Sequence, residues 1–204
     1  MEATLNETHA LLRNRRSTRQ FTGRSVPVGL LNQILETGTR APSAHNRQPW
    51  RFAVVTDIQA KAGLAAAMGE RFRRDLQIDG EQRTDIDRRV KKSAERILKA
   101  PVVVILCSCM EDMDIYLDPK RQAFEHLMAA QSVALAGGNI LNAASLEGLG
   151  GVWICAPLFA QEAVRQALQL PAEWEPQGML LLGYPDGNIE MRARKALEDV
   201  VIFR

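Results

Sequence analysis

The sequence predicts one α+β domain, on three observations. The chain has 204 residues, of which 46% are hydrophobic and 25% charged, an ordinary composition for one globular domain. Four apolar runs have the character of strands, and stretches with helical apolar spacing separate them. No repeat, low-complexity tract or linker divides the chain. We therefore expect a single domain over 1–204.

The first third of the chain is expected to hold three helices and one strand. Helical apolar spacing predicts a short helix over 4–14 and a second helix that opens at Val26-Pro27. An alternating run predicts a strand over 51–55. Asp57 is then placed to cap an alanine-rich helix over about 58–76.

The middle of the chain contains its most polar stretch, followed by its most apolar one. Residues 81–98 predict a solvated helix, either a surface excursion or a lid over a site. The unbroken run from Val102 to Cys107 predicts a strand buried on both faces. A long helix is expected over about 120–146. Its adjacent Gly137 and Gly138 cost ~1 kcal/mol each in a helix interior, which suggests that another backbone or a ligand comes very close.

The last third is expected to add two strands, one helix and a tail. The strands are predicted over 152–155 and 177–183, with a helix over 157–168 between them. The apolar end of the tail (about 192–204) would fray unless something holds it. It either adds a strand to the sheet of a neighbouring subunit or packs on its own chain.

The connection from Ala41 to Trp50 is the first candidate site. Its two prolines push Ala41 and Gln48 towards extended conformations and stiffen the loop. A stiff loop rich in hydrogen-bonding side chains suits a flat ligand with many polar atoms. An ordinary polar connection fits the same residues equally well.

A cluster of arginines is the second candidate site. Guanidinium groups and hydroxyls match phosphate oxygens, and both are concentrated in one short stretch formed by Arg15, Arg16, Ser17 and Arg19. Arg192 and Arg194 form a second basic pair. A solvated basic patch is the ordinary alternative for such a run.

Several classes of protein and site are disfavoured. The net charge of +2 is too balanced for a nucleic-acid-binding protein, and no apolar run has the ~18–20 residues of a membrane helix. Three cysteines without metal-type spacing suggest reduced thiols in the cytoplasm. His9, His45 and His126 show no metal-ligand spacing, and the chain lacks the glycine fingerprints of nucleotide sites. A bound cofactor would therefore carry any chemistry.

The chain resembles the FMN-dependent nitroreductase family over about residues 13–200. The resemblance rests on an ordered set of motifs: Arg15 to Phe21, Ala41-Pro42-Ser43, Gln48-Pro49-Trp50, Gly148–Gly151, Gly178–Gly183 and the tail arginines. Within the family, residues 41–52, 70–95 and 170–176 look most like the FMN-binding reductase domain fused to the γ-glutamyl ligase of deazaflavin coenzyme synthesis. The ligase half is missing here.

The resemblance implies a mainly antiparallel sheet flanked by helices, in an intertwined homodimer with two FMN sites at the interface. Arg15, Arg16, Ser17 and Arg19 would hold the phosphate and ribityl chain, together with Arg192 and Arg194. Pro42, Ser43, Ala44, Asn46 and Gln48 of the other subunit would line the flavin ring. Backbone N–H groups around Cys155, Ala156 and Pro157 would face its N5 edge. His45 and Arg47 would select the substrate, and the tail would reach the partner.

The expected activity is a ping-pong hydride transfer through FMN. NAD(P)H would reduce the flavin and leave, and an electron-poor acceptor (a nitroaromatic, a quinone or a conjugated C=C bond) would take its place. The flavin N5 does the chemistry, so no side chain is expected to be catalytic. Two alternatives remain: a reductase for a deazaflavin or its precursor, and a flavin-binding module without turnover.

Overall fold

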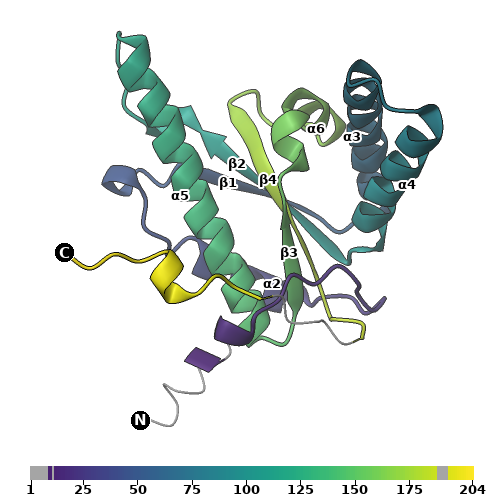
Figure 1. Ribbon diagram of the computed structural model, residues 1–204, viewed down its shortest axis with the longest axis horizontal. Helices are drawn as coiled ribbons and strands as arrows, with labels where there is room; N and C mark the ends of the chain where they lie inside the picture. Colours follow the sequence, from purple (N-terminus) through teal and green to yellow (C-terminus); the bar gives the residue numbers. More distant parts are fainter. Residues whose placement is uncertain (1–8, 11, 188–192) are drawn as a thin grey trace.

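A four-stranded antiparallel sheet forms the centre of the computed structural model, which describes residues 9–10, 12–187 and 193–204 (Figure 1). The strands lie in the order β1-β2-β4-β3, so β1 and β3 are the edges. They are β1 (Trp50–Val55), β2 (Val102–Cys109), β3 (Gly150–Ile154) and β4 (Trp174–Gly183). All three pairings are antiparallel, which confirms the expected α+β class.

Helices cover both faces of the sheet. One face carries α2 (Val28–Gly38) and α5 (Pro119–Leu146), and the other carries α3 (Ile58–Ile78), α4 (Arg83–Lys99) and α6 (Gln161–Ala167) (Figure 1). Strand β2 serves both faces, because successive side chains of a strand point to opposite sides. Val104 belongs to the core under α5, whereas Val103 belongs to the core under α3. This explains why the run at 102–107 is apolar without alternation.

The helix starts follow the sequence. The Asp57 carboxylate accepts the Ala60 N–H at 2.8 Å and caps α3. Asp118 caps α5 by accepting the N–H groups of Lys120 and Arg121, and Pro119 occupies the first turn. The helix predicted over 4–14 falls largely outside the described residues, of which 9–10 and 12–14 are helical.

Three local expectations are wrong. Pro27 stands before α2 as its N-cap rather than in its first turn. Residues 156–167 form a 3₁₀ turn (Ala156–Phe159) followed by α6, because Ala160 has φ −136° and interrupts the helix. The chain turns at Gly148, which has φ +75°, and Gly150 and Gly151 already belong to β3.

The close approach expected at Gly137 comes from side chains rather than from a backbone or a ligand. A Cβ on Gly137 would lie 2.4 Å from the Trp153 ring and 2.7 Å from Leu106. A Cβ on Gly138 would meet nothing within 4 Å in this chain. Of the two glycines, only Gly137 therefore allows α5 to lie close to the sheet.

Helices α3 and α4 pack on each other as a hairpin on the face opposite α5 (Figure 1). Ile86 and Ile97 of α4 are buried in this contact, and most of its charged side chains face solvent. The predicted solvated helix at 81–98 is thus confirmed, and the choice between a surface excursion and a lid over a site stays a prediction. It does not cover loop 41–50 of its own chain.

Candidate functional site

The arginine segment (residues 15–19) is an extended strip fastened to the edge of the sheet. Ser17 forms a parallel bridge with Gly151 of β3, and the Thr18 N–H donates to the Gly151 carbonyl at 3.0 Å. The Thr18 side chain is only 2% exposed and lies where a Cβ on Gly150 would stand. Pairing to β3 therefore sets the position of the segment.

Ser17 and Arg19 are exposed and Thr18 between them is buried, as expected where alternate side chains of an extended segment point to opposite sides. Arg15 is half-buried and follows the helical turn at 12–14. The Arg15 guanidinium makes no hydrogen bond with any described residue, and Arg19 makes one long bond, 3.4 Å to the Ser17 carbonyl. Arg16 is committed differently: its Nη1 donates to the Arg13 and Arg15 carbonyls at 3.0 and 2.9 Å. Arg15 and Arg19 are thus the guanidinium groups most available to an anion.

Loop 41–50 is stiff, but not in the way that its prolines predict. His45, Asn46 and Gln48 have φ of +48°, +55° and +52°, the left-handed region that costs non-glycine residues ~1–2 kcal/mol each. The expectation that Gln48 is extended is wrong. It avoids the right-handed helical region before Pro49 by turning to positive φ instead.

Two hydroxyls hold the first half of the loop. Ser43 Oγ accepts the Gln48 N–H at 3.1 Å and closes the loop on itself. Ser132 Oγ, from the middle of α5, accepts the Ala44 N–H at 3.3 Å and donates to the Met128 carbonyl. The left-handed residues between these two anchors are exposed, so their side chains are available to a ligand.

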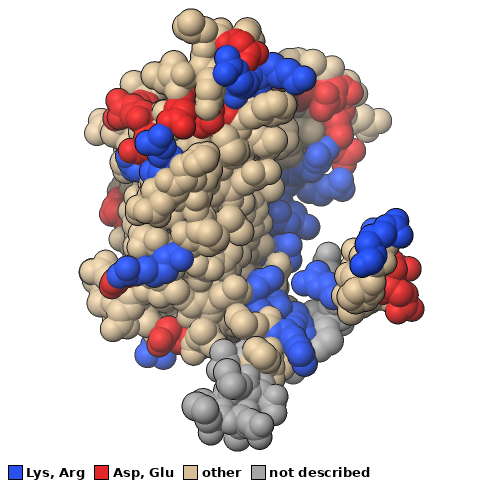
Figure 2. Space-filling view, turned by 90° about the vertical axis from the view of Figure 1, so that its left-hand side faces the viewer, with Lys and Arg blue, Asp and Glu red and all other residues tan. Residues whose placement is uncertain are grey.

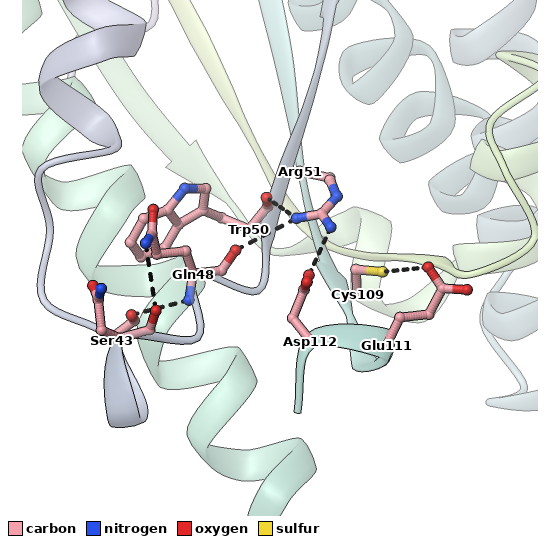
Figure 3. A network of polar contacts seen from close by, with 8 residues as sticks. Ser43, Gln48, Trp50, Arg51, Cys109, Glu111 and Asp112 are labelled. Atoms are coloured by element: carbon pink, nitrogen blue, oxygen red, sulfur yellow. Dashed lines mark hydrogen bonds and ion pairs between the residues drawn. The ribbon is translucent and has the colours of Figure 1, made fainter. Parts of the chain in front are cut away.

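Two ion pairs hold the second half of the loop to the segment after β2. Arg47 pairs with Asp114. Arg51 pairs with Asp112 at 2.6 Å, as Figure 3 shows. The Cys109 N–H donates to the Pro49 carbonyl at 2.8 Å, and Trp50 is buried. Arg47, predicted to select the substrate, is therefore already neutralised by a carboxylate of its own chain.

Cys155 ends the edge strand β3 with an exposed thiol. The Trp153 indole N–H donates to its sulfur at 3.2 Å. Cys107 and Cys109 differ from it, because both are buried in β2. Burial raises the pKa of the Cys107 thiol to about 12 and also raises the pKa of Cys109. Of the three residues predicted at the flavin edge, Pro157 has no N–H, so Cys155 and Ala156 are the possible backbone donors and the assignment stays a prediction.

A single chain does not bring the two predicted halves of the site together. Loop 41–50 is anchored at Ser132, in the middle of α5, and the arginine segment is anchored at Gly151, whose Cβ position lies 2.7 Å from the Leu141 side chain of the same helix. At ~1.5 Å per residue, Ser132 and Leu141 are roughly 14 Å apart along α5. Arg194 lies exposed in the tail, and Arg192 lies outside the described residues.

The outer face of α5 is a broad surface without charge (Figure 2). Its exposed large side chains are Phe124, Leu127, Leu135 and Leu146, with Leu127 54% and Leu135 50% exposed. Lys and Arg side chains gather along one border of this surface (Figure 2). The tail also leaves Val200, Ile202 and Phe203 exposed, so packing on its own chain does not explain their apolar character.

Sequence reasoning missed the residues that support the site. Ser132 was indistinguishable from the other small residues of α5, and Asp112 and Asp114 lay in a stretch expected to be irregular. Arg51 followed Trp50 as an unremarked strand residue. Only the fold shows that these side chains converge on loop 41–50.

No helix among the described residues combines the length and apolar character that crossing a membrane requires. Within those residues there is also no group of three or more His, Cys, Asp or Glu side chains that could hold a metal ion.

Comparison with known proteins agrees with the architecture. The chain is 33% identical to an NADH dehydrogenase of Thermus thermophilus, over an alignment that covers 100% of both proteins. A Desulfovibrio desulfuricans protein described as a nitroreductase, solved in complex with FMN, superposes with a TM-score of 0.74 at 25% identity, covering 97% of this chain and 96% of that one. A BluB-like flavoprotein of Clostridium difficile has the same fold, with a TM-score of 0.80 at 22% identity, covering 96% of this chain and 97% of that one.

The family profile extends over most of the chain. It matches residues 12–184, a range that starts before the arginine segment and ends just after β4. The narrower likeness to the deazaflavin-ligase branch stays a prediction. The chain belongs to the nitroreductase family.

Proposed function

We propose that this protein is an FMN-dependent NAD(P)H oxidoreductase that passes a hydride, by a ping-pong mechanism, to an electron-poor acceptor. The observation that carries the proposal is that the segment containing Arg15, Ser17 and Arg19 is fastened to the edge strand β3. FMN, when bound, supplies the redox chemistry at its N5 atom. The protein supplies binding, orientation and charge.

The arginine segment suits the phosphate of FMN. Among the described residues, Arg15 makes no side-chain hydrogen bond and Arg19 makes one long one, and the exposed Ser17 stands between them in the chain. Guanidinium forks bind phosphate oxygens two at a time with charge-assisted hydrogen bonds. Because Ser17 is paired to Gly151, the segment is ordered before the ligand arrives, which lowers the entropic cost of binding.

Strand β3 connects this phosphate site to the proposed N5 edge. Ser17 is paired at Gly151, near the start of the strand, and Cys155 follows the end of the strand. At ~3.3 Å per residue, the distance along the strand is roughly 13 Å. FMN lying along β3 would place its ring near the backbone N–H groups of Cys155 and Ala156.

Loop 41–50 would reach this ring from a second copy of the chain. Within one chain the anchors of the loop and of the arginine segment lie at different levels of α5, roughly 14 Å apart along the helix. The uncharged outer face of α5 and the exposed apolar tail both favour burial against another subunit. In a homodimer, Ser43, Asn46 and Gln48 of one subunit would complete the site of the other.

The hydride donor needs no nucleotide-binding domain of its own in this arrangement. The nicotinamide would stack on the exposed face of the flavin, leave, and be replaced by a flat acceptor. His45 is exposed beside the proposed ring contacts and remains our candidate for acceptor selection. Arg47 would contribute only after its ion pair with Asp114 opens.

Purified full-length protein tests the proposal directly. It should be yellow, or become yellow with added FMN, and anaerobic titration with NADH or NADPH should bleach the flavin absorbance. A panel of nitroaromatics, quinones and conjugated enones should then restore it. Protein that stays colourless with FMN would refute the proposal. Yellow protein that neither donor bleaches would favour a reductase of deazaflavins or a flavin-binding module.

A further inference from the structure

The strongest unassigned feature is the hydrogen-bonding centre formed by Arg51. This residue lies in β1, directly after the candidate loop, and its side chain turns back towards that loop (Figure 3). Its Nη1 donates to the Trp50 carbonyl at 2.9 Å and to the Gln48 carbonyl at 3.4 Å. Its Nη2 donates to Asp112 Oδ2 at 2.6 Å. One guanidinium thus joins the loop to the segment after β2.

The strand itself does not need this arrangement. The register of β1 is set by backbone pairing with β2, in which Trp50 faces Ser108 and Val55 faces Val103. The Arg51 and Asp112 side chains are 31% and 35% exposed, and an exposed ion pair of this kind contributes ~0–1 kcal/mol to stability. The contacts of Arg51 therefore have more to do with the loop than with the fold.

Gln48 is the residue on which these contacts act. Its N–H is held by Ser43 Oγ at 3.1 Å and its carbonyl by Arg51, so its backbone is fixed on both sides at φ +52°. Its side chain is exposed and makes one long contact, Nε2 to the Asn46 carbonyl at 3.4 Å. A carboxamide held in this way presents a donor and an acceptor, which match the alternating C=O and N–H groups of a flavin ring edge.

We propose that Arg51, anchored by Asp112, is a positioning residue that holds Gln48 in its left-handed conformation for contact with the flavin ring. This inference rests on the proposed function. Without the guanidinium, Gln48 loses one of its two backbone anchors and relaxes from a conformation that is costly for a non-glycine residue. The ring then loses a preorganised contact, whereas the phosphate site at Arg15 and Arg19 is untouched.

The test compares FMN with riboflavin, which has the same ring and no phosphate. In full-length protein, Arg51→Met should raise the dissociation constants of both flavins by the same factor, about tenfold, since a hydrogen-bonded contact is lost at the ring. Quenching of flavin fluorescence measures both constants. Arg51→Lys, which keeps the charge but not the planar fork, should give a similar loss. Asp112→Asn should give a smaller one.

Two controls distinguish a positioning role of Arg51 from a general effect of removing an arginine. Arg40→Met removes an exposed arginine paired with Glu36 on α2 and should leave both constants unchanged. In the Gln48→Ala background, Arg51→Met should weaken ring binding no further, because the residue that Arg51 positions is already gone. If Arg51→Met does not fold, Asp112→Asn and Arg51→Lys provide the same comparison.

Three results would overturn the inference while leaving the proposed function intact. They are unchanged flavin constants in the Arg51 and Asp112 variants, a loss for FMN but not for riboflavin, and additive losses in the Gln48→Ala background. Wild-type protein that binds neither flavin would instead refute the proposed function itself. The two failures are therefore distinguishable.

Discussion

The arginine segment and loop 41–50 are two parts of one proposed site, yet the chain builds them by opposite means. The arginine segment is extended backbone with ordinary φ values, and pairing with Gly151 sets its position. Loop 41–50 has three left-handed residues, and among the described residues its only close backbone bond to the sheet before β1 is the one from the Cys109 N–H to the Pro49 carbonyl. Side chains hold the rest of it, Ser43 from the loop itself and Ser132 and Asp114 from other elements. The first region is positioned by backbone pairing, and the second mainly by side chains.

This difference predicts how each region fails. A change that disturbs the edge of β3 should displace the arginine segment as a unit and affect both stability and phosphate binding. A change at residues 45–48 should alter flavin contacts with little effect on stability, because these residues are exposed and only the ends of the loop, Ala41 and Trp50, belong to the core.

The largest effect is expected from removing the guanidinium groups of Arg15 and Arg19. The Arg15→Ala/Arg19→Ala double variant should raise the FMN dissociation constant by about 10²–10⁴-fold, because each charge-assisted hydrogen bond contributes ~1.5–3 kcal/mol. Fluorescence titration measures this, and thermal unfolding of the flavin-free protein should not change. Arg13→Ala, an exposed arginine just before the segment, is the matched control. Full flavin occupancy in the double variant would show that the phosphate site is misassigned.

The next largest effect tests whether the two regions meet only across subunits. Leu127→Asp/Leu135→Asp places two charges on the uncharged face of α5, and burying an unpaired charge costs several kcal/mol. Light scattering should show a monomer, and flavin should be lost although both binding regions are unaltered. Ile78→Asp adds a charge at an exposed apolar position on α3 and should remain dimeric and yellow. A monomeric variant that retains FMN would contradict the two-subunit site.

Gly150→Ala tests the coupling of the arginine segment to the sheet. The added Cβ would lie 2.4 Å from Thr18 Oγ1, so the segment must shift. Overpacking of this kind costs ~1–3 kcal/mol and should lower the melting temperature by several degrees. The affinity for FMN should fall more than the affinity for riboflavin, since the residues that bind the phosphate move. Gly63→Ala, with nothing within 4 Å on α3, should instead keep or raise stability.

The loop should respond differently to relief of its backbone strain. Asn46→Gly replaces a residue at φ +55° by one that adopts this conformation freely, so the melting temperature should stay constant or rise slightly. Flavin affinity should fall a few-fold, because the amide is lost and the loop gains freedom. A marked loss of stability would show that the Asn46 side chain, rather than the backbone, shapes the loop.

The sequence predicted most of the architecture because its signals are local. Asp57 as a cap and the apolar run at 102–107 each identify an element without knowledge of its neighbours. It also identified both candidate regions, since their residue types are concentrated in short stretches. It did not reveal that Arg16 bonds to its own backbone or that Asp114 neutralises Arg47. Those contacts depend on where separate elements meet.

Prolines also misled the prediction in an instructive way. A residue before proline avoids the right-handed helical region, and an extended conformation is the usual outcome. At Gln48 the two backbone anchors, Ser43 Oγ and Arg51, favour the left-handed alternative. Tertiary contacts thus chose between two conformations that the local rule leaves open.

The smallest effect concerns Cys155, which lies where the two regions are proposed to meet. Iodoacetamide at pH 8 should label this exposed thiol in the native protein, and mass spectrometry of peptides identifies the site. Cys107 should stay unlabelled, because burial raises its pKa to about 12 and leaves about one molecule in ten thousand as thiolate at that pH. Unfolding in denaturant should expose all three cysteines to the reagent. Added FMN should slow labelling of Cys155 if the flavin ring lies at the end of β3. Equal rates of Cys155 labelling with and without FMN would place the flavin ring elsewhere. The end of β3 would then not belong to the site that the arginine segment and loop 41–50 form.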